Sequence, residues 1–147
     1  MSNKPRPRFH LAFPVHNLEA ARNFYGELIG CPEGREDPGK WIDFDFYGHQ
    51  IVTHFAPEEC GGAIANEVDG KKVPVRHFGL LMEWSDWEAL ASRLKAGGAD
   101  FLIEPYVRFA GQAGEQGTFF VIDPSGNALE FKSFRDEGQI FAISSTI

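Results

Sequence analysis

The sequence predicts a mixed α+β domain built from two similar modules, and three observations support this class. The chain has 147 residues, 43% of them hydrophobic, which is enough for one well-packed core. Both halves begin with a strand-like run that leads into a helical stripe, and in both halves further strand-like runs follow. We expect the first module at about 8–56, a linker at about 57–73 and the second module at about 74–135.

The first module begins with a run in which apolar residues alternate with smaller or polar ones. This run, Phe9 to Val15, is typical of a strand with two different faces, and His10 faces away from the bulky apolar side. Asn17 is a good N-cap, and apolar residues at helical spacing run from Leu18 to Leu28 before Gly30, which is placed to end the helix. After a turn region at 32–39, two strands are expected, at 41–46 and 50–55.

The second module repeats this order. A strand at 76–82 precedes a helix, for which Ser85 and Glu88 form a capping-box signature and Gly97 is a stop signal. Three further strands are expected, at 101–108, 118–122 and 127–134. The segment between the modules, 57–72, is rich in glycine and charge and fits an exposed linker, in which one more strand can lie.

Composition argues against several classes of function. The formal net charge of −7 argues against nucleic acid as a partner, because such binding needs clustered positive charge. No run approaches the roughly 20 apolar residues that cross a bilayer, and no secretory signal is visible, so we expect a cytoplasmic protein without membrane contact. Cys31 and Cys60 are expected to be reduced thiols.

Two histidines and one glutamate indicate a metal site. His10 and His77 stand at equivalent points, each near the start of the strand that leads into its module's helix. Glu130 lies in a largely apolar strand, where an isolated carboxylate is costly unless a cation or another positive partner compensates it. A single strand histidine is more often a hydrogen-bonded core residue, and a strand glutamate is often only solvated. Their equivalent placement favours a divalent metal with open positions.

Three segments give the sequence its resemblance to a known family: His10–Gly30, Arg76–Met82 and, most specifically, FFVIDPSGNALEFKSF from Phe119 to Phe134. The chain resembles the vicinal oxygen chelate superfamily, which includes glyoxalase I, extradiol dioxygenases and bleomycin resistance proteins. The resemblance implies two βαβββ modules whose curved mixed sheets form a cavity. It also implies that His10, His77 and Glu130 bind the metal, and that the protein is a homodimer.

The run GEQGTFF from Gly114 to Phe120 resembles, more narrowly, a bacterial subgroup of predicted extradiol-type dioxygenases. That resemblance implies Fe(II) or Mn(II) and a small substrate that chelates the metal through two oxygens. One departure stands out, because the ring-cleaving members usually carry a tyrosine where this chain has 118–122. Two alternatives stay open: a glyoxalase-type lyase or isomerase with Ni(II), Co(II) or Zn(II), and a resistance protein that only binds a small molecule.

Three further residues are candidates for work on the substrate. His54 lies in the last strand of the first module, at a place that roughly corresponds to Glu130, and it is a catalytic base, a fourth ligand or a structural residue. Tyr106 and Arg108 share a strand face and would suit an anionic substrate. The alternative for Arg108 is a surface ion pair with an acid such as Glu104.

Overall fold

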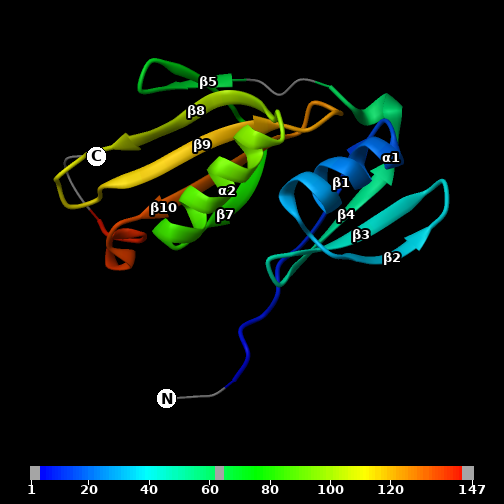
Figure 1. Cartoon of the computed structure of the whole chain (residues 1–147), viewed down its shortest axis with the longest axis horizontal. Helices are drawn as coiled ribbons and strands as arrows, with labels where there is room; N and C mark the ends of the chain where they lie inside the picture. Colours follow the sequence, from blue (N-terminus) through cyan, green and yellow to red (C-terminus); the bar gives the residue numbers. More distant parts are fainter. Residues whose placement is uncertain (1–3, 62–64, 144–147) are drawn as a thin grey trace. The chain divides into compact units, whose positions relative to one another are not determined.

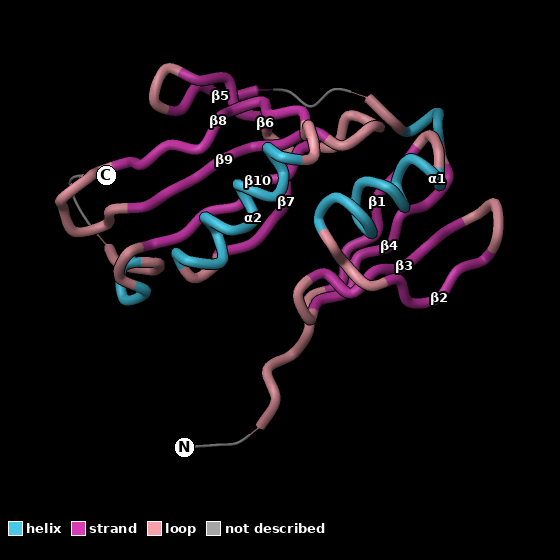
Figure 2. The backbone as a smooth tube through the Cα atoms, in the orientation of Figure 1, coloured by secondary structure: helices cyan, strands magenta, loops and turns pink. Residues whose placement is uncertain are grey.

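The computed structural model describes residues 4–61 and 65–143. The chain divides into two compact units, Met1–Gly61 with Pro124–Gly126 and Gly62–Asp123 with Asn127–Ile147. Each unit holds one four-stranded sheet, and a two-stranded hairpin is added in the second (Figures 1 and 2). This arrangement confirms the predicted α+β class with two modules. No helix in the described ranges is long and apolar enough to cross a membrane.

The first unit contains one sheet, one interrupted helix and a short turn of helix. The elements are β1 (His10–Val15), α1 (Leu18–Ala21), the π-helical η1 (Arg22–Ile29), β2 (Glu33–Asp37), β3 (Trp41–Phe46), β4 (His49–Phe55) and the 3₁₀ turn η2 (Pro57–Glu59). The strand order is β1-β4-β3-β2, and the pair formed by the edge strand β1 with β4 is parallel. One face of this sheet packs against the helix.

The core of the first unit is aromatic, and Tyr25 stands at its centre. Its fully buried ring lies 5.5 Å from Phe13 and 5.8 Å from Phe44, so β1, η1 and β3 are joined through one side chain. Alternation along the strands then leaves a second face that the helix does not cover. That face, called the open face of the first unit, carries His10, Ala12, Pro14, Gln50, Val52, His54, Trp41, Asp43 and Asp45.

The second unit repeats the plan with longer strands. Its elements are β5 (Ala65–Val68), β6 (Lys71–Pro74), β7 (His77–Leu81), α2 (Trp84–Ala96), β8 (Asp100–Arg108), β9 (Gln116–Ile122), β10 (Ala128–Phe134) and the 3₁₀ turn η3 (Glu137–Gln139). The main sheet has the order β7-β10-β9-β8, and β7 and β10 are parallel. The sheet order therefore matches that of the first unit strand for strand.

Trp87 on α2 fixes the helix against this second sheet. Its indole Nε1 donates a hydrogen bond of 2.8 Å to the Phe131 carbonyl, and its ring fills the space beside Gly117, where a Cβ would lie 2.7 Å from it. The opposite face, called the open face of the second unit, carries His77, Gly79, Leu81, Glu130, Lys132, Thr118, Phe120, Tyr106 and Arg108.

Several local predictions are confirmed at the level of single residues. Asn17 caps α1 by accepting a 2.9 Å hydrogen bond from the Ala20 N–H, and Gly30 ends η1 in the left-handed conformation at φ 91°. The predicted helix at 18–28 exists, but most of it has π geometry, a form that local sequence spacing does not reveal. Cys31 and Cys60 are not joined in a disulfide bond in the structure.

Three predictions about local structure are wrong. The helix after β7 begins at Trp84, with Glu83 as its N-cap and no side-chain cap, so Ser85 lies inside the first turn. The supposed linker contains η2 and the β5–β6 hairpin, which gives it two strands where we expected at most one. The supposed turn region 32–39 contains β2.

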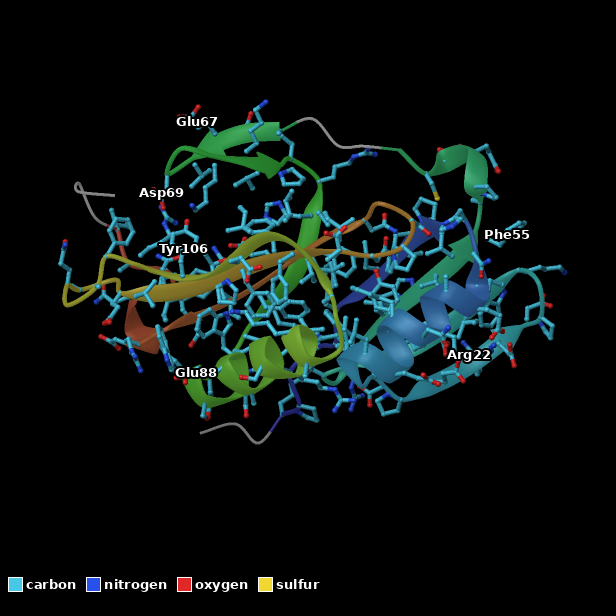
Figure 3. All side chains as sticks on the ribbon, turned by 45° about the horizontal axis from the view of Figure 1, so that its top comes forward. Arg22, Phe55, Glu67, Asp69, Glu88 and Tyr106 are labelled. Atoms are coloured by element: carbon cyan, nitrogen blue, oxygen red, sulfur yellow. The ribbon has the colours of Figure 1, made fainter. Side chains whose placement is uncertain are left out.

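The strand β2 escaped prediction because its residues, EGRED, carry no apolar alternation. It pairs with β3, and Arg22 on η1 adds ion pairs: Arg22 contacts Glu33 and lies 3.0 Å from Glu36, both on β2 (Arg22 is marked in Figure 3). Hydrogen bonding to Glu33 is the largest of the effects that raise the pKa of Arg22. The strand thus depends on a partner distant in sequence. A pattern of apolar residues within the strand cannot reveal such a partner.

Candidate functional site

The structure brings two of the predicted ligands together on the open face of the second unit. His77 is the first residue of β7 and Glu130 lies in the neighbouring β10, two positions along the parallel register. The His77 Nε2 lies 3.3 Å from the Glu130 Oε1, and the Glu130 side chain is only 14% exposed. A mostly buried carboxylate therefore faces an imidazole nitrogen.

The other ring nitrogen of His77 defines which nitrogen carries the proton in the neutral ring. Nδ1 lies 2.6 Å from the backbone carbonyl of Pro74, the last residue of β6. A carbonyl oxygen can only accept a hydrogen bond, so Nδ1 must donate and Nε2 is left with its lone pair. The Phe120 ring stands edge-on to the imidazole at 5.0 Å and limits its rotation. This is the tautomer of a histidine that binds metal through Nε2.

Glu130 has further partners that orient its carboxylate. The Thr118 hydroxyl on β9 donates a 2.5 Å hydrogen bond to Oε2, and Lys132 Nζ lies 3.8 Å from Oε1. Thr118 is a residue that sequence reasoning missed as part of the site, although we noted it as the departure from the tyrosine pattern. Its position opposite Lys132 and beside Glu130 follows from the antiparallel register of β9 and β10, which the sequence alone does not reveal.

The distance between His77 and Glu130 fits a shared cation. Two donors that bind one divalent ion at bond lengths of about 2.1 Å lie roughly 3.0–3.4 Å apart. The 3.3 Å between Nε2 and Oε1 falls within that range. The same separation suits an ion pair with a doubly protonated imidazole, in which case Nε2 donates to the carboxylate.

His10 occupies the matching place in the first unit. It is the first residue of β1, is exposed, and lies on the open face of that unit. Its Nδ1 lies 2.7 Å from the Gln50 side-chain oxygen Oε1, so the pattern at His77 recurs with a side chain in place of a backbone carbonyl. Gln50 is not among the predicted site residues, and its contact with His10 follows from the β1–β4 register.

The predicted triad is thus divided between the two units. His77 and Glu130 are adjacent in the second, while His10 belongs to the first. Among residues 4–61 and 65–143, no three His, Cys, Asp or Glu side chains are grouped closely enough for a metal ion. Two imidazoles that each keep Nε2 unprotonated, together with one carboxylate, are nonetheless a chemically suitable donor set for a divalent transition metal.

The position of His54 differs from the predicted correspondence with Glu130. In the parallel pairs, Glu130 stands opposite Gly79 and Val52 stands opposite Ala12, two residues beyond His77 and His10 respectively. Val52 is therefore the counterpart of Glu130, and His54 is the counterpart of Lys132, about 6.6 Å further along the strand. His54 does lie on the open face of the first unit, as predicted, and it is exposed.

Tyr106 and Arg108 share the open face of the second unit, and both contact one carboxylate. The Tyr106 hydroxyl donates a 3.1 Å hydrogen bond to Asp69 Oδ2, and Arg108 Nε lies 2.6 Å from the same oxygen. Tyr106 and Asp69 are labelled in Figure 3. Asp69 forms the tip of the β5–β6 hairpin, so this hairpin is fastened to β8. The expected alternative for Arg108, an ion pair with an acid, agrees with this contact, but the acid is Asp69. Glu104, which we gave as the example, pairs with Lys95 at 3.5 Å instead.

These contacts shift two pKa values. Desolvation is the largest effect on Asp69 and raises its pKa, but hydrogen bonds from Arg108 and Tyr106 and nearby positive charge outweigh it and lower the pKa overall. Desolvation, followed by the hydrogen bond to Asp69, raises the pKa of Tyr106. Tyr106 therefore stays a neutral donor, and Asp69 stays an anion, over the whole physiological range.

Comparison with known proteins places this geometry in a wider context. A family model described as the Glyoxalase/Bleomycin resistance protein/Dioxygenase superfamily matches residues 9–131. No curated protein matches the sequence significantly. A glyoxalase/bleomycin resistance protein/dioxygenase structure from Alicyclobacillus acidocaldarius is similar, with 34% identity, a TM-score of 0.77 and coverage of 95% of this chain and 100% of the other.

More distant structures share the fold. A fosfomycin resistance protein from Listeria monocytogenes has 13% identity and a TM-score of 0.67, with 92% and 98% of the two chains covered. A lactoylglutathione lyase from Agrobacterium tumefaciens has 19% identity and a TM-score of 0.64, with 95% and 98% covered. At these identities the likeness concerns the fold alone.

Proposed function

The chain belongs to the glyoxalase/bleomycin resistance protein/dioxygenase superfamily, and on that premise we propose that it is a metal-dependent oxidoreductase of the extradiol type. Its substrate would be a small molecule that chelates the metal through two neighbouring oxygens. His10, His77 and Glu130 would hold the metal. The ion, Fe(II) or Mn(II), would supply positive charge against the developing anion and leave positions for substrate oxygens and O2.

One observation carries this proposal: both histidines engage an acceptor through Nδ1. The Gln50 oxygen accepts from His10 at 2.7 Å and the Pro74 carbonyl accepts from His77 at 2.6 Å. In its neutral form, each ring therefore presents the lone pair of Nε2 on the open face of its sheet. Structural histidines have no common reason to share this tautomer, whereas Nε2 ligation requires it.

The residues around the ligands would bind the substrate and move protons. Arg108 and Tyr106 contact the Asp69 carboxylate in the structure, and they would bind an anionic group of the substrate in exchange for that carboxylate. His54 is an exposed imidazole on the open face of the first unit and would take or return a proton. Phe120, next to His77, would exclude water from that side of the site.

A glyoxalase-type lyase or isomerase, with Ni(II), Co(II) or Zn(II), is the second candidate, and the strand register argues against it. Such an enzyme would take a fourth protein ligand from β4. The residue in register with the Glu130 position is Val52, which has no donor atom, and His54 lies two residues beyond it. Three protein ligands leave more open positions than four, which supports the extradiol proposal.

A metal inventory of anaerobically purified protein, followed by oxygen uptake with a panel of catechols, tests the proposal. We expect about one Fe or Mn per chain and oxygen consumption with ring-opened product for at least one catechol. Isomerase activity with Ni(II), Co(II) or Zn(II) and without oxygen consumption would favour the lyase. Protein that neither retains nor takes up a divalent metal would point to a binding module of the resistance type.

We further propose that the protein is a cytoplasmic homodimer. Exposed apolar side chains on both units, including Phe9 at 61% and Leu81 at 50%, offer surface that a second copy could cover. Sedimentation velocity on the full chain tests this proposal. A single species of about 33 kDa, twice the 16.4 kDa of one chain, is expected.

A further inference from the structure

Asp43 is a buried carboxylate that the proposed chemistry does not use. It lies on β3, on the open face of the first unit, and is only 4% exposed. Its Oδ1 accepts a hydrogen bond from the Arg35 backbone N–H, and its Oδ2 accepts one of 3.1 Å from Gln50 Nε2. Burying a charge at this position is costly, so the contacts of the carboxylate need an explanation.

The surroundings are shaped to admit this carboxylate. A side chain at position 34 would overlap the Asp43 carboxylate, so the glycine there leaves it room, and β2 has an irregular register at this point. The Arg35 guanidinium is 3.6 Å away, but that side chain is 80% exposed and gives little compensation. The specific side-chain partner is therefore the half-buried Gln50 amide.

The Asp43 carboxylate determines the orientation of the Gln50 side-chain amide. An ionised carboxylate only accepts hydrogen bonds, so the NH2 group of Gln50 must face Asp43 and the amide oxygen must face the other way. The amide oxygen lies 2.7 Å from His10 Nδ1. Because that oxygen also only accepts, Nδ1 carries the proton and Nε2 keeps its lone pair.

We propose that Asp43 and Gln50 are positioning residues that set the tautomer of His10. We call the chain Asp43–Gln50–His10 the carboxylate–amide relay. It does for His10 what the backbone carbonyl of Pro74 does for His77. Its purpose rests on the proposed function, in which His10 binds the metal through an unprotonated Nε2.

Asp43→Asn tests the proposal because it should reverse the direction of the hydrogen bonds that link residue 43, Gln50 and His10. The new asparagine keeps an oxygen for the Arg35 N–H and turns its NH2 group toward Gln50, where two donors would then face each other. A flip of the Gln50 side-chain amide removes this donor–donor contact and places the Gln50 NH2 group against His10 Nδ1. Nδ1 must then accept, so the proton moves to Nε2.

The readout is the ring nitrogen signals of ¹⁵N-histidine-labelled full-length protein at about pH 8.5, where imidazoles are neutral. Long-range ¹H–¹⁵N correlations distinguish a protonated from an unprotonated ring nitrogen. We expect protonated Nδ1 at His10 in the wild type and protonated Nε2 in Asp43→Asn. Asp45→Asn, which removes a carboxylate that accepts from Gly48 in the adjacent turn, should leave His10 unchanged.

A double variant tests whether the change at His10 in Asp43→Asn is caused by loss of folding. Adding Gln50→Glu to Asp43→Asn supplies an acceptor-only group to His10 and lets the new asparagine donate to it, so the Nδ1–H tautomer should return. His77 signals should stay the same in all variants. The proposal is overturned if Asp43→Asn keeps Nδ1 of His10 protonated, or if the double variant keeps Nε2 protonated.

Metal affinity, measured by competition with a chelator, gives the second readout. Asp43→Asn should weaken binding of Fe(II) or Mn(II) by about 10–100-fold, and the double variant should restore it. Wild-type protein that binds no divalent metal would refute the proposed function. The nitrogen signals would still decide the relay, so the two failures are distinguishable.

Discussion

Gly79 lies directly opposite Glu130 in the parallel β7–β10 pair, and the Glu130 backbone occupies the space that a Cβ at position 79 would need. The absence of a side chain at this position therefore allows β10 to approach β7. That approach places the carboxylate beside His77. Glycine is required here for close contact between strands, since its backbone does not adopt a left-handed conformation.

Gly79→Ala should therefore destabilise the fold and disturb the site. We expect the free energy of unfolding to fall by about 1–3 kcal/mol, because the new methyl group meets backbone that cannot rotate away. Urea denaturation measures this effect. Gly61→Ala is the matched control, because a Cβ there meets nothing within 4 Å. Equal stability of the two variants would contradict the argument.

Thr118→Val should weaken metal binding with little effect on the fold. The variant keeps the side-chain shape but removes the 2.5 Å hydrogen bond that orients Glu130 Oε2. Loss of such a supporting contact typically costs 10–100-fold in metal affinity, a range that chelator competition resolves. Thr53→Val is a suitable control, since it removes a buried hydroxyl within the first unit, where that hydroxyl donates to the Ile42 carbonyl. Similar metal affinities in both variants would argue against this role for Thr118.

The β5–β6 hairpin should detach from β8 in acid. The folded-state pKa of Asp69 is lowered from its ordinary 3.8, so the stabilisation is present above that value and is lost as the pH falls through the lowered pKa. Hydrogen exchange of the hairpin amides as a function of pH follows this detachment. Asp69→Asn, which tolerates the positive φ of 53° at this position, should show fast exchange already at neutral pH.

Glu67→Gln is the control for that experiment, because Glu67 is exposed on the same hairpin (Figure 3). It should exchange as the wild type does. Hairpin exchange in Asp69→Asn that matches the wild type at neutral pH would show that the hairpin is held by other contacts.

His54→Asn separates the possible roles of that histidine. If His54 moves a proton, turnover should fall by about 10²–10⁴-fold while the metal content stays unchanged. A combined loss of metal and activity would identify His54 as a ligand, and retained activity would make it structural. His49→Asn serves as control, because His49 is the first residue of β4 and its Nδ1 accepts a hydrogen bond from the Phe9 N–H at 3.0 Å.

The sequence predicted the repeated architecture because hydrophobic alternation and helix caps are local. The run from Phe9 to Val15 and the cap at Asn17 each depend on neighbours a few residues away, and both appear where expected. The strand β2 and the hairpin do not have such patterns. They depend on Arg22 and on Tyr106 with Arg108, partners that lie far along the chain.

The same division applies to the site. By itself the sequence determined which residue types were available, namely His10, His77 and Glu130 at suggestive points of a repeat. Only the tertiary structure decided that His77 meets Glu130, that Val52 rather than His54 stands in register with the glutamate position, and that Asp43 reaches Gln50. The reason is physical: pairing register and hydrogen-bond direction arise between strands, whereas a sequence pattern reports only periodicity within one strand.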